Sequence, residues 1–249
     1  MTLTHTAIVL RRQESGESDR RLTLLTEDAG KVTAVAKGAR KANSRLAGVS
    51  EPLSYARYTL AAGKVNRFVT QSEPIAAFRA LRRDFDRLSY ALGLAELYGV
   101  VLPEQQPDPE AFDLLRRSLE ALESHPRPDV ALLWAETKLM EHTGFFPSLD
   151  ACVDTGEGIV GDSCWLSPMA GGVVSDLSSN RYGDRLRSSP EIVTALLRLP
   201  EFEEPPSNVK RTPEALLALV PFWRNIAESN LPAHSAAMDA IRLVVAQGP

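Results

Sequence analysis

Cysteine and long hydrophobic runs are scarce in this sequence, and each scarcity excludes a class of proteins. Only Cys152 and Cys164 occur among 249 residues, which excludes a disulfide-rich secreted scaffold. The longest apolar run, Ala215–Trp223, contains a proline and is too short to cross a bilayer. At the start of the chain, arginines follow the apolar run Ala7–Leu10 rather than precede it, which favours a strand over a signal peptide. We therefore expect a cytoplasmic protein with no membrane partner.

Catalytic motifs are also lacking. The sequence has no phosphate-binding G-x-x-x-x-G-K-[ST] loop, no G-x-S-x-G elbow and no H-E-x-x-H pair. Gly156–Gly161 matches G-x-G-x-x-G by spacing, but it does not open a helix after a strand, as a dinucleotide site requires. The four histidines are scattered, and we expect each to be a surface or packing residue: His5, His125, His142 and His234. We expect no enzyme.

The net charge of −4 conceals an asymmetry along the chain. Residues 1–80 hold 13 Lys and Arg against 7 Asp and Glu, a net charge of +6, whereas residues 81–249 carry −10. A basic head on an acidic body indicates that the first part alone meets a polyanion.

Residues 1–80 predict a small β-barrel. Five short segments, rich in apolar and β-branched residues, are separated by polar turns and glycines. The expected strands are Thr4–Leu10, Leu22–Thr26, Lys31–Ala36, Leu53–Leu60 and Val65–Gln71. An OB-type barrel and an SH3-like barrel both fit this count.

From Pro74 onward the apolar residues recur with helical spacing. One expected stripe runs through Phe78, Leu81, Phe85, Leu88 and Leu92. Three later helix starts place a capping residue before proline and a carboxylate, at Asp108-Pro109-Glu110, Ser189-Pro190-Glu191 and Thr212-Pro213-Glu214. Further helices are expected over Asp129–Thr143 and Ala233–Val245. Together they predict a helical bundle over residues 81–144 and 189–249.

Residues 145–188 lack this periodicity and contain both cysteines. A loop of that length is unusual inside a compact domain, so we expect a small inserted subdomain. The fold class is then α+β with several domains. A structural zinc needs four ligands, usually from two closely spaced cysteine pairs. Neither cysteine has such a partner, and His142 supplies a third ligand at most, so two idle thiols are the expectation.

Basic residues concentrate after the third strand. Between Asp28 and Glu51 the chain has five cations and no acid, which is typical of a loop that follows a phosphate backbone. A solvated surface loop is the alternative. The candidate DNA-binding residues are Lys31, Lys37, Arg40, Lys41, Arg45 and, on the fifth strand, Arg67. Tyr55 and Tyr58 are candidates for stacking on bases, but Phe68 and at least one of these two tyrosines are expected in the barrel core.

These residues resemble the start of the RecO recombination mediators, in order and spacing, over about 45 residues. The matching segments are Ala7–Leu10, Gly16–Asp19, Thr26–Lys31, Ala36–Lys41 and Ser44–Arg45. A looser resemblance extends through the chain, including a turn at Gly144–Pro147 and a segment at Ser167–Val173. It implies an N-terminal OB barrel, a helical bundle and an inserted zinc-ribbon-like subdomain at residues 145–188.

The resemblance also implies a function that the residues alone do not. RecO proteins are non-enzymatic; they bind single- and double-stranded DNA, anneal complementary strands, and act with RecR to help RecA replace the single-strand-binding protein, SSB. The expected partners are therefore both forms of DNA, RecR, the acidic SSB tail and, indirectly, the RecA filament. An adaptor whose basic barrel docks acidic protein tails remains the alternative.

The insertion departs from the family pattern. Many members bind zinc there through two C-x-x-C pairs, but the corresponding positions read Cys152, Thr155, Ser175 and Ser178. Three of four ligands are missing, so no cofactor is expected.

Overall fold

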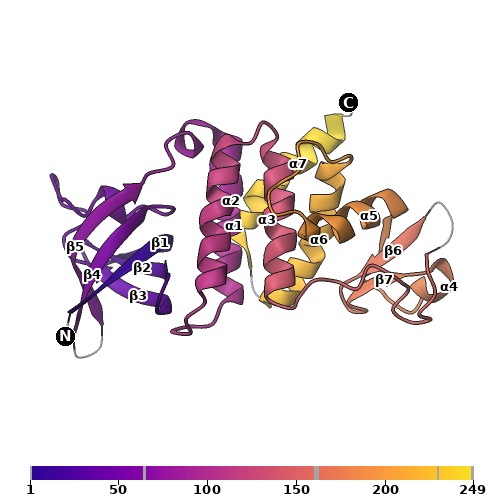
Figure 1. Cartoon of the computed structure of the whole chain (residues 1–249), viewed down its shortest axis with the longest axis horizontal. Helices are drawn as coiled ribbons and strands as arrows, with labels where there is room; N and C mark the ends of the chain where they lie inside the picture. Colours follow the sequence, from indigo (N-terminus) through magenta and orange to yellow (C-terminus); the bar gives the residue numbers. More distant parts are fainter. Residues whose placement is uncertain (1, 64–65, 160–162, 229, 248–249) are drawn as a thin grey trace. The chain divides into compact units, whose positions relative to one another are not determined.

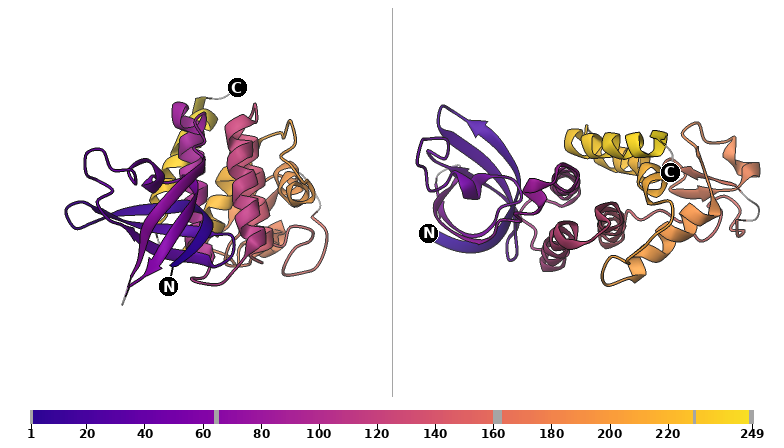
Figure 2. Two further views of the ribbon diagram at one scale, coloured as in Figure 1. Left: turned by 60° about the vertical axis from the view of Figure 1, so that its left-hand side comes forward. Right: turned by 90° about the horizontal axis from the view of Figure 1, so that it is seen from above.

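The computed structural model describes residues 2–63, 66–159, 163–228 and 230–247. The chain divides into two compact units, residues 1–123 and 124–249. Five strands of the first unit close into a barrel in the order β1-β2-β3-β5-β4 (Figures 1 and 2). They are β1 Thr2–Ser15, β2 Asp19–Thr26, β3 Gly30–Ala36, β4 Tyr55–Ala62 and β5 Arg67–Ala76. Each lies at an expected position, except that Val65 of the fifth prediction is outside the described residues.

The strand order decides between the OB-type and the SH3-like barrel, which both fitted the sequence. All neighbouring strands are antiparallel except β3 and β5, which pair in parallel through Ala34–Arg67 and Val35–Phe68. A closed five-stranded barrel with this crossover is an OB fold. Its interior is filled by alternate side chains of every strand, as the two-residue period of a strand requires.

Two helices complete the first unit, α1 Phe85–Val101 and α2 Pro109–Ser124. The predicted stripe from Phe78 is wrong at its start, because the Asp84 carboxylate accepts the Arg87 N–H and begins the helix there. Phe78 lies before the helix at φ +42°, and Phe85 in its first turn is 79% exposed. The Asp108 cap of α2 is confirmed by a 2.9 Å bond from the Ala111 N–H.

The barrel is attached to the segment after α1 at Gly30, the first residue of β3. Its φ is +69°, and a Cβ there would lie 2.0 Å from the Gln106 carbonyl oxygen, so only glycine fits. The barrel strands end at Ala76, and α1 and α2 belong to the same compact unit as the barrel, which extends to Glu123.

The second unit contains four long helices: α3 Pro128–His142, α5 Pro190–Arg198, α6 Thr212–Ala227 and α7 Pro232–Gln247. α6 packs against the other three. The Ser189 hydroxyl caps α5 as predicted, accepting the Ile192 N–H at 3.4 Å. The Thr212 cap is wrong, because this hydroxyl donates backward to the Val209 carbonyl at 2.9 Å and Arg211 precedes the helix instead.

Between α3 and α5, the insertion forms the three-stranded sheet β7-β6-β8. Its elements are β6 Cys164–Ser167, β7 Gly172–Val174, the short helix α4 Asp176–Ser179, and β8 Leu186–Ser188. Residues 160 and 161 of the glycine-spaced segment lie outside the description, and residues 156–159 open no helix. Within the described residues, no helix has the length and apolar character needed to span a membrane.

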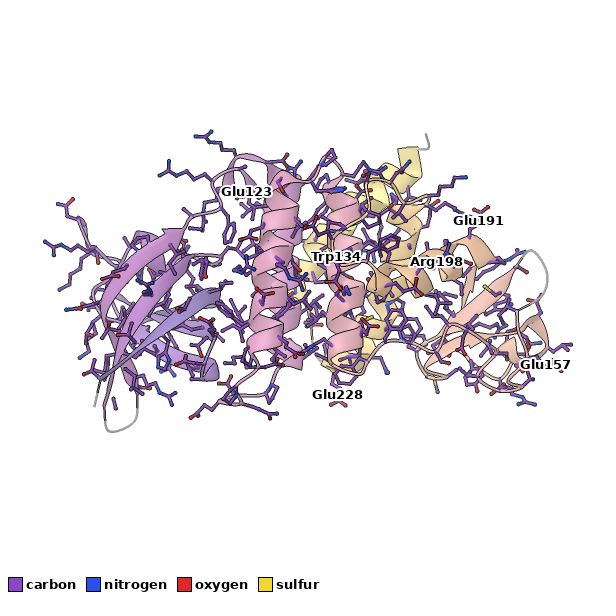
Figure 3. The ribbon with its side chains drawn as sticks, viewed as in Figure 1. Glu123, Trp134, Glu157, Glu191, Arg198 and Glu228 are labelled. Carbon is purple, nitrogen blue, oxygen red and sulfur yellow. The ribbon has the colours of Figure 1, made fainter. Side chains whose placement is uncertain are left out.

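Short 3₁₀ segments connect some of these elements. Gly48–Ser50 and Leu81–Arg83 lie in the first unit, and Leu199–Glu201 lies in the second. In that unit, Trp134 of α3 (Figure 3) donates its indole N–H to the Phe202 carbonyl at 3.0 Å. This bond ties α3 to the end of the third 3₁₀ segment.

Candidate nucleic-acid interface

The basic loop, Lys37–Arg45, leaves the barrel at the end of β3 and folds as successive turns. The Lys41 N–H donates to the Gly38 carbonyl and the Ser44 N–H to the Lys41 carbonyl, each at 3.1 Å. At its start, the Gly38 N–H donates to the Asp19 carboxylate at 2.7 Å. The loop therefore has a defined backbone rather than an open coil.

Apolar and buried groups hold this loop and its continuation against the barrel. Ala39 is 1% exposed and belongs to the barrel core, with Leu46 and Val49 packed against it. From the interior, the Tyr58 hydroxyl donates to the Val49 carbonyl at 2.6 Å. From the side, the Arg20 guanidinium donates to the Ala47 carbonyl at 3.0 Å. The apolar residues thus face inward while the intervening cations face solvent.

The four loop cations that the sequence singles out are exposed on this surface: Lys37, Arg40, Lys41 and Arg45. Arg40 forms an ion pair with Glu14 at 3.1 Å. Within the described residues, Lys37, Lys41 and Arg45 form no ion pair. In the described part of the chain, these three positive charges are therefore not neutralised by an ion pair.

Lys31 and Arg67 have different surroundings. Lys31 is 7% exposed; its Nζ donates to the Gly99 carbonyl at 2.6 Å and lies 3.5 Å from Glu104. Its expected contact with DNA is thus contradicted by burial, because its charge already has partners inside the first unit. Arg67 is half-buried, and its guanidinium donates to the Gln105 side chain at 3.0 Å. Only part of its guanidinium is therefore accessible to a DNA phosphate.

The two candidate stacking residues do not present free rings. Tyr58 is 0% exposed in the barrel core, where burial raises the pKa of its phenol. Tyr55 is half-buried, and its ring packs edge-on against Phe112 with centroids 6.1 Å apart. Alternation along β4 turns Tyr58 inward, which contradicts its stacking assignment and confirms that at least one of the two tyrosines lies in the core.

Phe68, which the sequence assigned to the core, is half-buried outside the core cluster. The Lys37 ammonium lies over its ring, 4.4 Å from the centroid. Sequence reasoning missed this because the register of β5 decides its face: Val69, the next residue, points into the barrel.

Beside the loop lies an open hollow of about 530 Å³. It is lined by Ser18, Asp19, Lys37, Gly38, Lys41, Ala42, Asn43 and Ser44. Ser18 lies in the β1–β2 turn and Asp19 is the first residue of β2. Sequence reasoning missed their part because they are 18 positions or more from the basic loop's first lysine. Two ammonium groups and several hydroxyl and amide groups around one hollow suit a phosphate group, and the one carboxylate among the lining residues, Asp19, accepts the Gly38 N–H.

We expect Tyr58→Phe to lower the free energy of unfolding by about 1 to 2 kcal/mol, because it removes a buried hydrogen bond and leaves the Val49 carbonyl without its donor. Urea unfolding measures this. The substitution keeps the aromatic ring, so a stacking role predicts unchanged stability, and that result would contradict the anchoring role.

The four family zinc positions adjoin one another in the insertion without offering a zinc site. The Cys152 thiol sulfur accepts the Ser175 N–H at 3.3 Å. Burial raises the pKa of this thiol, but hydrogen bonds from Ser175 and Thr155 outweigh it and bring the pKa to about 6. Ser178 hydrogen-bonds the neighbouring Asp154 carboxylate, and burial raises the pKa of Cys164 to about 11.

One thiol and three hydroxyls do not fit zinc, which takes four thiolate, imidazole or carboxylate ligands in structural sites. In the described part of the chain, no three His, Cys, Asp or Glu side chains are grouped to hold a metal ion.

We expect elemental analysis of the purified chain to find no stoichiometric zinc, because three ligand positions lack a donor that zinc prefers. Treatment with a chelator should leave thermal unfolding unchanged. About one zinc per chain would contradict this expectation.

Comparison with known proteins identifies the family. Residues 1–78 match the model described as recombination protein O, N terminal, and residues 82–225 match its C-terminal counterpart. The chain belongs to the RecO family. Its OB barrel and helical body are the two parts that these models describe, and the family places the chain in DNA repair and recombination.

Relatives named DNA repair protein RecO agree with this assignment. The protein of Heliobacterium modesticaldum is 38% identical over 77% of this chain and 71% of its own length. That of Desulfitobacterium hafniense is 40% identical over 68% and 61%, and that of Bacillus pumilus is 34% identical over 63% and 61%. The match thus spans only about 60 to 70% of these relatives.

Proposed function

We propose that this RecO chain binds single-stranded DNA through the basic loop of its barrel and acts in repair without catalysing a reaction. The observation that carries the proposal is the set of three exposed cations without an ion pair in the described residues, Lys37, Lys41 and Arg45, on a loop whose backbone is held by hydrogen bonds. Each cation that meets a phosphate releases condensed counterions, which favours association.

The position of the loop on the barrel supports the same proposal. OB folds bind oligonucleotides on the face of strands two and three and at the turns between strands one and two and strands four and five. Here the basic loop follows β3, and the end of the β1–β2 turn, Ser18, lines the same hollow together with Asp19, the first residue of β2. Phe68 is the second residue of β5, just after the β4–β5 turn, and its ring contacts the Lys37 ammonium. The three segments form one surface.

The wider activities follow from the family resemblance. We propose that the chain also binds double-stranded DNA and anneals complementary strands. We further propose that it works with RecR to load RecA onto DNA coated with SSB, whose acidic tail it contacts, in the cytoplasm near the nucleoid. Contacts to the phosphate backbone suit this role, because they carry no sequence information.

A direct binding comparison tests the proposal against the adaptor alternative. Fluorescence anisotropy of a labelled oligothymidylate and of a labelled acidic peptide would be followed as the chain is added. We expect saturable binding of the oligonucleotide that weakens as salt rises. Binding of the peptide alone would favour the adaptor and contradict DNA binding.

A further inference from the structure

The surroundings of Phe68 differ from those of Tyr58, the aromatic residue in the core cluster of the barrel. Its neighbour Val69 is 5% exposed within the core cluster, whereas Phe68 lies outside that cluster and is half-buried. One edge of its ring rests against Gly63, where a Cβ would come within 2.7 Å of the ring. A glycine at that position therefore makes room for the ring on the outer surface of the barrel.

One face of the Phe68 ring is covered by the side chain of Lys37, which can move away from it. The Lys37 ammonium lies 4.4 Å from the ring centroid, and the Lys37 side chain is exposed and without an ion pair in the described residues. An exposed cation–π contact is weak, while a contact between an ammonium and a phosphate is charge-assisted. Because Lys37 also lines the hollow beside the loop, a phosphate there competes with the ring for the same ammonium.

We propose that Phe68 is a base-stacking residue that Lys37 covers in the free protein and uncovers when a DNA phosphate draws Lys37 toward the hollow. One nucleotide is then held at two points, by its phosphate at Lys37 and Lys41 and by its base on the Phe68 ring. The inference rests on the proposed DNA-binding function and adds a contact to the bases that the cations do not provide. Every base has a π-face, so this contact is tolerant of sequence.

The test compares two ligands that differ only in their bases. The affinity of the chain is measured for an oligothymidylate and for an abasic deoxyribose-phosphate strand of equal length. We expect Phe68→Leu to weaken binding of the oligothymidylate about fivefold or more, the lower end of what one stacked base contributes, and to leave binding of the abasic strand unchanged. Phe68→Tyr should retain wild-type affinity, and Ile75→Ala, an exposed apolar residue on the same strand, serves as the matched control.

Phe68→Trp supplies a second readout that does not depend on removing the ring. Its added fluorescence should be quenched by the oligothymidylate and not by the abasic strand. Equal losses on both strands for Phe68→Leu, or no loss on either, would overturn the stacking role while leaving DNA binding intact. A wild-type chain that binds neither strand would overturn the proposed function itself, and the stacking role with it.

Discussion

Replacing Lys37 and Lys41 by glutamate should weaken binding of single-stranded DNA about tenfold or more at moderate salt. Both side chains are exposed, line one hollow and have no ion pair among the described residues. The exchange removes two phosphate contacts and adds like-charge repulsion against the strand. Stability should change by less than about 0.5 kcal/mol, the usual range for exposed positions away from caps and cores. Anisotropy titration measures the affinity, and thermal unfolding measures the stability.

A charge-matched control separates the loop from net charge. Arg198→Glu with Lys210→Glu makes the same change in net charge at two exposed positions of the second unit (Arg198 is labelled in Figure 3). We expect this variant to bind DNA with nearly wild-type affinity. An equal loss in both variants would mean that net charge alone, and not the basic loop, controls binding.

Glu136→Leu should lower the stability of the second unit by about 3 to 5 kcal/mol, the range for removing one member of a buried polar pair. Glu136 is 0% exposed on α3. One carboxylate oxygen accepts the Trp223 indole N–H at 2.8 Å, and the other lies 3.2 Å from the His234 imidazole. The substitution removes the acceptor of the buried Trp223 indole N–H and the carboxylate beside the His234 imidazole.

Tryptophan fluorescence during urea unfolding measures this effect directly, because all three tryptophans lie in the second unit. Glu141→Leu changes an exposed glutamate on the same helix and should shift stability by less than about 0.5 kcal/mol. If Glu136→Leu were as stable as this control, the buried cluster would not hold α3, α6 and α7 together.

The order of elements could be predicted because it depends on local signals. Strand alternation, glycine punctuation and proline-containing caps act within a few residues, and they located the five strands, α2 and α5. The start of α1 was missed because the apolar spacing from Phe78 imitates a helix, while the Asp84 cap decides where the helix begins. The Glu136 cluster joins residues 87 and 98 positions apart, and no local pattern signals such a contact.

In the candidate site, too, features that depend on local signals were predicted and contacts between distant residues were not. A run of cations without acids predicted the basic loop, and exposure of Lys37, Lys41 and Arg45 agrees with the position expected for them. Lys31 is also in that run, but it pairs with a helix terminus and Glu104, which lie about 70 residues later in the chain. The core position expected for at least one tyrosine is confirmed by Tyr58, but the sequence did not indicate which tyrosine, and it placed Phe68 on the wrong face, because the register that turns Tyr58 inward and Phe68 outward is set by pairing between strands.

The salt dependence of DNA affinity tests the central claim most directly. The affinity of the wild-type chain and of the Lys37→Glu, Lys41→Glu variant would be measured for one oligothymidylate over a range of salt concentrations. Each lost phosphate contact reduces the slope of log affinity against log salt by about 0.7 for single strands. We predict that the slope of the variant is shallower than that of the wild type by about 1.4, which is the value for two contacts. A folded variant with the wild-type affinity and the wild-type slope would contradict the assignment of the basic loop as the DNA-binding surface.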